Sequence, residues 1–272
     1  MSSLPCNAGA VPFFPAQDFE QKRAAIFKHI AGSNRLAEVR PASGLEVRPR
    51  PEMLSTGIPE IDAMSGGIPR GCLSEMYGAA SSGKTSALLA VIASATRRHE
   101  TCVLIDASDS FDPASGQAAG MDFENLLWVR CGRHKGTKRD HGEYRLEQVL
   151  KSTDLILQSG GFGLVALDLA GIPEEFVRRI PLASWFRFQR AVEHTKTALL
   201  VITEFRCAEG CAALIFKFSQ LSAVSHQSSV KPAHTQLLES VQLQVEIVRS
   251  RLERKPVQSV KTEFTALAVR AG

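Results

Sequence analysis

The chain has 272 residues, a formal net charge of +4 at neutral pH, 44% hydrophobic residues and 22% charged residues. This composition is typical of a globular protein, and no stretch reaches the roughly 18 apolar residues of a membrane span. The start of the chain has no basic segment before an apolar core, so it predicts no secretory signal. The small net charge permits contact with nucleic acid without indicating it.

The N-terminal part of the chain differs in composition from the rest. Residues 1–16 are rich in proline, alanine and glycine, residues 17–30 have the spacing of a short amphipathic helix, and residues 32–51 carry prolines among arginines. We therefore predict a flexible N-terminal arm over residues 1–51, with one short helix and a linker, ahead of a core over residues 52–272.

Within the core, short apolar segments alternate with segments of helical periodicity. The predicted strands are residues 72–77, 101–106, 126–130, 163–168 and 198–203, and the predicted helices are residues 58–64, 86–98, 145–158 and 181–194. Apolar strands separated by helices predict a parallel sheet covered on both faces. Residues 240–248 alternate strictly between apolar and polar side chains, and residues 260–269 do so less regularly. These two segments predict an antiparallel extension at one edge of the sheet.

The most specific motif follows the first predicted strand of the sheet. Residues 78–85, GAASSGKT, form a complete G-x-x-x-x-G-K-T phosphate loop between a strand and a helix. In this context backbone N–H groups surround a phosphate, Lys84 reaches the β- and γ-phosphates, and the Thr85 hydroxyl binds Mg²⁺. The alternative is a glycine-rich turn that binds nothing. We predict binding of ATP with Mg²⁺ through Gly78, Ser81, Ser82, Gly83, Lys84 and Thr85.

Two of the predicted strands end on aspartate. Asp168 ends the strand 163–168, where a carboxylate can hold Mg²⁺ through water, and the alternative is a cap on the next segment. Asp106 ends the strand 101–106, where a role in the nucleotide site and a role as a turn-forming residue both remain open. The predicted metal site is therefore Thr85 with Asp168.

A basic loop that contains glycine follows the third predicted strand, at the edge of the sheet where ligands of α/β proteins bind. It either contacts DNA phosphates or an acidic partner, or it is a solvated loop. No aromatic residue lies among its cations, so any binding of DNA is expected to be weak, electrostatic and independent of sequence. The candidate contact residues are Arg133, Lys135, Lys138 and Arg139.

The helix 181–194 carries the aromatic residues Trp185, Phe186 and Phe188. Most such aromatic side chains belong to a core, but successive residues of a helix cannot all face inward. We therefore predict a partner contact on this helix and name Trp185 as its candidate.

Several segments together resemble the RecA recombinase family. The matching segments are residues 54–57, 61–62, 66–71, 75–78, 81–85, 105–107, 112–113, 118–122, 125–127, 163–168, 201–206 and 245–251. The resemblance covers about residues 53–270. It implies a RecA-like P-loop core of the α/β class, with a mostly parallel sheet, helices on both faces and no separate C-terminal domain.

The chain departs from that family on the hydrolytic side. Ser108 stands where the family has a glutamate that orients the attacking water, and serine cannot act as a base. Glu204 stands where the family has a glutamine that senses the γ-phosphate, and the segments that correspond to the DNA-binding loops are short. The resemblance therefore implies ATP binding with weak or absent hydrolysis, and no catalytic residue is assigned.

Arg249 and Arg251 lie at the end of the alternating tail strand, in the sequence Arg-Ser-Arg. In the RecA family the matching element reaches the phosphates bound by a neighbouring subunit, which implies self-association. The alternative is a solvated strand edge whose charges prevent aggregation. The two interpretations remain open, and both arginines are kept as nucleotide-binding candidates.

This combination resembles the ImuA-type accessory factors of bacterial mutagenic translesion synthesis, and residues 179–191 add to the similarity. The resemblance implies a Y-family-like polymerase adaptor and an error-prone polymerase as partners, with RecA as a further candidate. It also implies only weak DNA binding, no membrane, and a cytoplasmic location with nucleoid association after DNA damage. The alternatives are an active ATP-dependent recombinase and a division-inhibitor-type interaction protein with a vestigial phosphate loop.

Overall fold

The structure is a computed structural model that describes residues 16–31, 50–131, 138–208, 210–220, 240–252 and 260–267. The chain divides into two units, residues 1–49 and residues 50–272. The described part of the first unit is helix α1 (Ala16–Ala31), close to the predicted helix 17–30. The side chain of Ile26 on this helix is exposed, and those of Phe19 and Phe27 lie outside the described residues.

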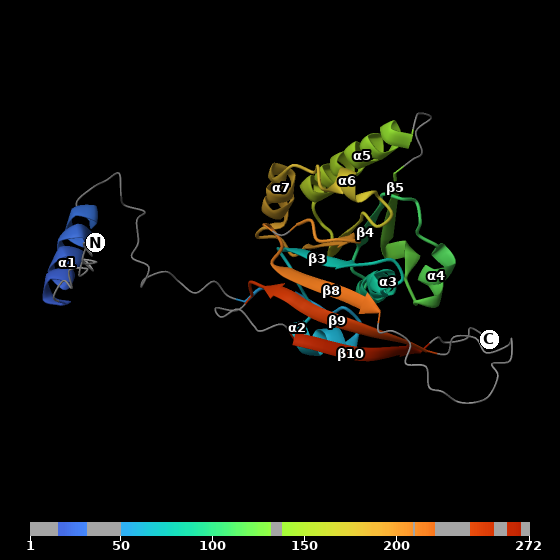
Figure 1. Cartoon of the computed structure of the whole chain (residues 1–272), viewed down its shortest axis with the longest axis horizontal. Helices are drawn as coiled ribbons and strands as arrows, with labels where there is room; N and C mark the ends of the chain where they lie inside the picture. The colour runs from blue at the N-terminus through green and yellow to red at the C-terminus, as the bar shows by residue number, and fades with distance from the viewer. Residues whose placement is uncertain are drawn as a thin grey trace, which may run out of the picture. The chain divides into compact units, whose positions relative to one another are not determined.

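The second unit is built on a sheet with the strand order β10-β9-β8-β3-β7-β6-β4-β5 (Figure 1). These strands are β3 (Leu73–Gly78), β4 (Cys102–Asp106), β5 (Leu126–Arg130), β6 (Leu164–Asp168), β7 (Ala198–Thr203), β8 (Leu214–Gln220), β9 (Ser240–Ser250) and β10 (Val260–Leu267). Strands β3 to β8 pair in parallel, whereas β9 and β10 add antiparallel pairs at one edge. The predicted α/β class, with a mostly parallel sheet and an antiparallel edge, is confirmed.

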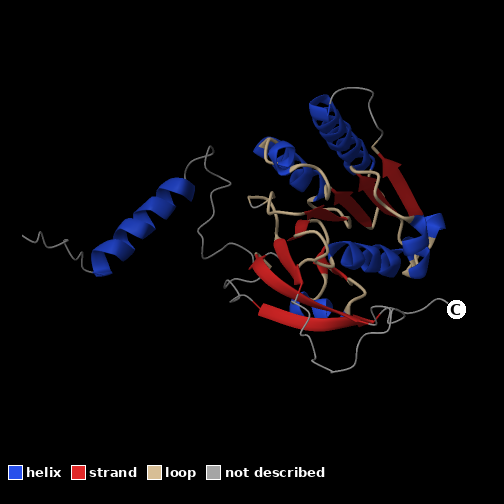
Figure 2. Ribbon diagram, turned by 45° about the vertical axis from the view of Figure 1, so that its right-hand side comes forward, coloured by secondary structure: helices blue, strands red, loops and turns tan. Residues whose placement is uncertain are grey.

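Helices lie on both faces of this sheet (Figure 2). They are α2 (Pro59–Ser65), α3 (Lys84–Thr96), α4 (Pro113–Ala118), α5 (Lys138–Ser159), α6 (Glu174–Val177) and α7 (Leu182–Val192). Helices α5, α6 and α7 share one buried apolar cluster with the sheet, and α2 and α3 share a second cluster with it. No helix in the described part of the chain is long and apolar enough to cross a membrane.

Strand β6 shows why the parallel strands are apolar throughout. Val165 and Leu167 belong to the cluster under α5 to α7, whereas Leu164 and Ala166 belong to the cluster under α3. Successive side chains of a strand point to opposite faces, and here both faces are covered. Apolar side chains are therefore favoured on both faces of the central strands, and the buried Ser74 and Glu75 of β3 are exceptions.

A packed corner precedes β3. The carboxylate of Asp62 on α2 accepts hydrogen bonds from the Ser55 hydroxyl at 2.6 Å, and from the backbone N–H and the hydroxyl of Thr56 at 2.8 and 2.7 Å. Strands β1 (Met53–Leu54) and β2 (Ile68–Pro69) pair here. Gly67 has a φ of +110°, and a Cβ at this position would overlap the backbone oxygen of Leu54. The residues that carry the family resemblance at this corner thus have structural roles.

Two elements differ from the predictions. Helix α5 begins at Lys138 rather than at residue 145, so Lys138 and Arg139 lie in its first turn and not in a loop. The sequence analysis predicts no strand over β8. Its residues Leu214, Ile215 and Phe216 are all buried, and only from Phe216 on do buried residues alternate with the exposed Lys217 and the half-buried Ser219.

Candidate nucleotide-binding site

The carboxyl ends of four parallel strands meet at one edge of the sheet. In register, Tyr77 of β3 pairs with Thr203 of β7, Ile202 of β7 pairs with Asp168 of β6, and Asp168 pairs with Asp106 of β4. The phosphate loop, the turns after β4 and β6, and the segment after β7 therefore lie together. This is the edge at which α/β proteins bind their ligands.

The backbone of the phosphate loop explains its two motif glycines. Gly83, which caps the N-terminus of α3, has a φ of +86°, a left-handed conformation that favours glycine. A Cβ at Gly78 would overlap the backbone oxygen of Phe218 and lie 2.6 Å from the hydroxyl oxygen of Ser82. The left-handed backbone therefore favours glycine at position 83, and close packing excludes a side chain at position 78.

The polar groups of this loop fit a nucleotide phosphate and its metal ion. Lys84 is 4% exposed, and its Nζ donates to the backbone oxygen of Ala79 at 3.0 Å, so the ammonium group lies over the loop. The Ser82 hydroxyl is buried without a hydrogen-bond partner among the described residues, and Thr85 is exposed. An ammonium group, an unpartnered hydroxyl and an accessible hydroxyl are the groups that phosphate and Mg²⁺ require.

Asp168 lies at the end of β6 and is 7% exposed. One of its carboxylate oxygens accepts the backbone N–H of Ala170 at 2.9 Å. Burial raises its pKa to about 6; the Ala170 hydrogen bond lowers the pKa, the charge of Asp106 raises it, and the charge of Lys84 lowers it. A divalent cation beside this carboxylate would offset its burial and its repulsion from Asp106.

Asp106 is engaged in holding the turn after β4. It is 1% exposed, and its carboxylate accepts the backbone N–H groups of Ser110 at 3.1 Å and Phe111 at 2.9 Å. The indole Nε1 of Trp128 donates to it at 3.4 Å. These contacts favour the turn-forming interpretation, although the charge of Asp106 still acts on Asp168.

The other polar groups of this turn also have structural partners. The Ser108 hydroxyl oxygen lies 2.9 Å from that of Ser110. Asp109 accepts two hydrogen bonds from the Arg130 guanidinium, at 2.6 and 2.9 Å. Asp112 caps α4 by accepting two backbone N–H groups, and the Ser115 hydroxyl together with these two N–H groups lowers its pKa. The acids beside Ser108 are therefore occupied and do not replace a water-orienting carboxylate.

The remaining nucleotide-site candidates lie at different ends of the sheet. Glu204 is exposed directly after β7, at the same edge as the phosphate loop. Arg249 pairs with Ile215 near the start of β8, whereas Gly78 pairs with Phe218 near its end. The structure thus does not bring Arg249, or Arg251 beyond it, to the phosphate loop of the same chain. A role at the phosphates of a second copy stays a prediction.

Of the predicted basic contacts, Arg133 and Lys135 lie outside the described residues, as do the side chains of Lys138 and Arg139. Trp185 on α7 is described and is 2% exposed. Its ring packs edge-to-face on Phe188, with the ring centroids 6.1 Å apart. Trp185 is therefore a core residue and not a surface aromatic.

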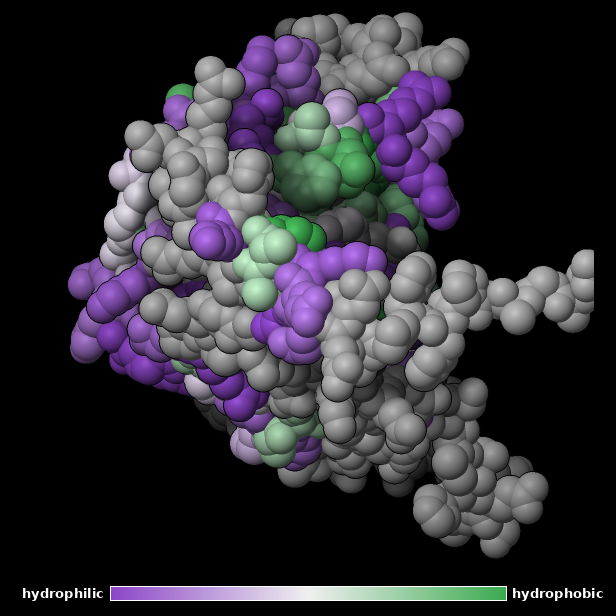
Figure 3. Space-filling view, turned by 90° about the vertical axis from the view of Figure 1, so that its left-hand side faces the viewer, coloured by the Kyte–Doolittle hydropathy of each residue, from purple (hydrophilic) through white to green (hydrophobic). Residues whose placement is uncertain are grey.

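The exposed apolar surface of α7 comes instead from Leu182 and Phe186, which are 56% and 46% exposed. They are one helical turn apart and share a face of the helix. A cavity of about 370 Å³ lies beside Leu182, and Figure 3 shows apolar side chains gathered in a hollow on the side of the molecule that carries α7. The cavity is lined by Val177, Arg178, Ile180, Leu182, Trp185, Arg206, Cys207 and Gly210.

A larger cavity of about 690 Å³ lies at the opposite end of the sheet, around Arg70 and Glu100. The Arg70 guanidinium donates to the backbone oxygens of Gly163 and Lys196 at 3.3 and 3.0 Å and pairs with Glu100 at 2.7 Å. The Arg70 Nε is buried without a hydrogen-bond partner in the described structure and lies 3.3 Å from a carboxylate oxygen of Glu52. The size of the cavity alone does not assign a ligand.

A strand, a phosphate loop and a helix, with an aspartate at the end of a nearby strand, define this unit as a P-loop domain of the α/β class. Residues 43–175 match the family model of the RecA N-terminal domain. The match and the sheet together support a RecA-like family, whose members generally bind ATP with Mg²⁺. The match ends within α6, so α7, β7 and the strands β8 to β10 lie beyond it.

Glu75, which no sequence motif marks as functional, is fully buried in β3. The sequence does contain an indication of its role. An acidic residue inside the apolar strand 72–77 requires polar partners once it is buried. Those partners come from residues distant in sequence, so the sequence did not reveal them.

Proposed function

We propose that this protein is a RecA-like ATP-binding accessory factor in DNA-damage-induced translesion synthesis, acting with a polymerase adaptor and an error-prone polymerase. One observation carries the nucleotide part of the proposal. The phosphate loop is complete and its polar groups suit a phosphate, whereas the acids of the neighbouring turn are held in structural contacts.

In this proposal Lys84, the Ser82 hydroxyl and the loop N–H groups hold the phosphates, and Thr85 and Asp168 hold Mg²⁺. The metal ion supplies neutralisation of the phosphate charge. Lys84 exchanges its contact with the Ala79 backbone oxygen, 3.0 Å long, for a phosphate oxygen. This exchange requires only a small movement of the side chain, because the ammonium group already lies over the loop.

Slow hydrolysis follows from the turn after β4. A positioned general base contributes about 10²- to 10⁴-fold to such a reaction. Ser108 cannot supply that proton transfer, and Asp109 is held by Arg130. ATP then acts mainly as a bound ligand that stabilises one state of the protein.

The partner part of the proposal rests on the resemblance to ImuA-type factors and on the apolar surface of α7. Leu182 and Phe186 are large exposed apolar side chains on one face of α7, and Leu182 also lines the cavity of about 370 Å³. Contiguous apolar surface of this kind is typical of protein contact sites.

DNA is expected to bind weakly and through charge, so its affinity should fall steeply with salt.

The proposal is tested by titration calorimetry with Mg·ATP, by turnover assays with and without single-stranded DNA, and by pull-down from DNA-damaged cells. Nanomolar to micromolar binding with slow turnover, and recovery of a polymerase adaptor, are the expected results. Turnover that single-stranded DNA raises to recombinase-like rates would favour an active recombinase. Absence of nucleotide binding would favour an interaction protein with a vestigial loop.

A further inference from the structure

Glu75 is a carboxylate in the centre of the sheet. It is 0% exposed, and in register it pairs with Val201 of β7 on one side and Ile215 of β8 on the other. Leu73 and Tyr77, the alternate residues of β3, pack on the side of α5 to α7, so the side chain of Glu75 points to the same face. A buried carboxylate without partners costs several kcal/mol.

The partners come from the segment that joins β7 to β8. Both strands run parallel to β3 and flank it, so residues 204–213 must return from the carboxyl end of β7 to the start of β8 across the face of β3. Such a crossover is usually helical, but the described part of this one contains no helix. Cys211 and Ala212 donate to the backbone oxygen of Ala208, but the buried N–H groups at the start of the segment need acceptors from elsewhere.

Glu75 supplies these acceptors. Its two carboxylate oxygens accept the backbone N–H of Cys207 at 2.6 Å and that of Ala208 at 3.2 Å. Burial raises the pKa of Glu75, whereas the two N–H groups, the Cys207 thiol and the charge of Arg206 lower it. Glu75 thus binds the first part of the crossover, whereas the N–H groups of Cys211 and Ala212 are bonded to the backbone oxygen of Ala208.

We propose that Glu75 is a positioning residue that anchors the 204–213 crossover to β3, so that the strand leading into the phosphate loop and the segment after Glu204 move as one. Glu75 lies three residues before Gly78, where the loop begins. On the other side of the anchor, Arg206 and Cys207 line the cavity beside Leu182 and Trp185. The anchor thus joins the phosphate loop to the apolar surface of α7.

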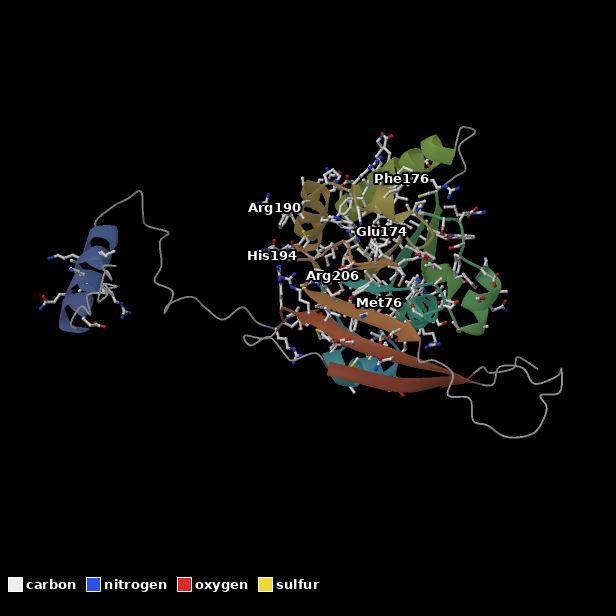
Figure 4. The ribbon with its side chains drawn as sticks, in the orientation of Figure 1. Met76, Glu174, Phe176, Arg190, His194 and Arg206 are labelled. Carbon is white, nitrogen blue, oxygen red and sulfur yellow. The ribbon has the colours of Figure 1, made fainter. Side chains whose placement is uncertain are left out.

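Figure 4 places Arg206 on the side of the sheet where α6 and α7 lie, with Glu174 and Phe176 of α6 above it in that view. A shift of the crossover would move Arg206 and change the wall of the cavity. The link to nucleotide rests on the proposed function, whereas the anchoring itself does not.

Hydrogen exchange tests the anchoring in the protein without nucleotide. In Glu75→Gln one side-chain oxygen is replaced by an NH₂ group that cannot accept a hydrogen bond, while size is kept. The retained carbonyl oxygen can still accept one backbone N–H, so at least one of the amides of Cys207 and Ala208 should exchange at least about tenfold faster, as expected for a lost hydrogen bond to a charged acceptor. Ser74→Ala is the matched control, because the neighbouring Ser74 hydroxyl is buried without a hydrogen-bond partner in the described structure. Unchanged exchange at residues 207 and 208 in Glu75→Gln would overturn the anchoring.

The reactivity of the Cys207 thiol gives a second measurement, which does not change if packing loosens elsewhere in the protein. Burial raises its pKa, and the charge and hydrogen bond of Glu75 raise it further. Glu75→Gln should therefore speed maleimide labelling of Cys207, located by peptide mass spectrometry, by about tenfold for each unit by which the pKa falls. Cys102 and Cys131, whose pKa values burial raises to about 12 and about 11, are internal references that should not change. Faster labelling of all three thiols would indicate general loosening and contradict the specific anchor.

Mg·ATP tests the link to the phosphate loop. Binding should slow exchange at residues 207 and 208 of the wild type by about fivefold or more, the lower range of typical coupling between sites. The same ligand should have less effect in Glu75→Gln. If calorimetry shows that ATP binds but exchange at residues 207 and 208 does not respond, the link is wrong. If ATP does not bind, the proposed function fails, and the anchoring is still judged by exchange without nucleotide.

Discussion

The phosphate loop and the turn after β4 lie at the same edge of the sheet, yet their polar groups are used in opposite ways. In the loop, the Ser82 hydroxyl has no partner in the described structure and Thr85 is exposed, so both are available to a ligand. In the turn, Asp106 and Asp109 are bound by backbone N–H groups and by Arg130. Binding of phosphate needs available donors, whereas hydrolysis needs an available acceptor. At this edge of the sheet the donors for a phosphate are available, whereas most of the carboxylate acceptors are already bonded to other groups of the protein.

Asp168 is the intermediate case between the two regions. One of its oxygens is held by Ala170, as in the turn, but its raised pKa of about 6 shows that this contact does not compensate for its burial. A bound cation would therefore stabilise the charged carboxylate of Asp168 more than it would stabilise the neighbouring carboxylates.

The strongest test of the difference between the two regions is whether the phosphate loop binds nucleotide. Lys84→Ala should reduce the affinity for Mg·ATP by at least about 100-fold, because a charged donor to the phosphates is lost. Calorimetry measures this, with Lys196→Ala as the control, since Lys196 is exposed at the other end of β7. Equal affinities in the two variants would mean that the loop does not hold the nucleotide.

The two sides of α7 should separate stability from partner binding. Trp185→Ala removes a ring that is 2% exposed and should lower the free energy of unfolding by about 3–5 kcal/mol. Phe186→Ala should change it by less than about 0.5 kcal/mol while weakening retention of the polymerase adaptor. Urea denaturation and pull-down measure the two effects. Undiminished pull-down by Phe186→Ala would remove this surface from the proposal.

The pH dependence of the free energy of unfolding tests whether Asp168 is a buried carboxylate with a raised pKa. Its pKa rises from 3.8 to about 6 on folding, so its contribution to stability is complete below about pH 4 and is lost as the pH rises through about 6. The loss amounts to about 3 kcal/mol. Without nucleotide, Asp168→Asn should therefore stabilise the protein at pH 7.5 by up to this amount and have little effect at pH 4.

Denaturant titrations at the two pH values measure this difference. The same variant should weaken Mg²⁺-dependent nucleotide binding, since the amide cannot carry the negative charge that attracts the ion. A stability change of equal size at both pH values would show that Asp168 is not a buried charge in the folded protein.

The smallest expected effect concerns the turn. Ser108→Glu should raise ATP hydrolysis by about tenfold, well below the 10²- to 10⁴-fold of an optimised base, because nothing else in the turn is adapted to hold it. Single-turnover hydrolysis measures the rate, and Ser110→Glu serves as the control two residues away. Equal gains in both variants would indicate a general effect of charge.

The sequence by itself determined the features that depend on neighbouring residues. The apolar runs predicted the parallel strands because a strand covered on both faces is apolar at most of its positions. The phosphate loop was predicted because its glycines, lysine and threonine act through a single stretch of backbone, residues 78–85. The helix α5 was placed too late because its first turns carry few apolar residues, so no periodicity marks where it begins.

Only the tertiary structure decided which polar groups are available. Asp109 and Arg130 are 21 positions apart, and Glu75 and Cys207 are 132 positions apart. Whether a carboxylate can act on a ligand depends on whether a donor from a distant segment already occupies it, and no local pattern contains that information. Burial has the same character, because Trp185 and Phe186 are adjacent aromatic residues of one helix, and only the packing of α7 on the sheet makes the first a core residue and the second an exposed one.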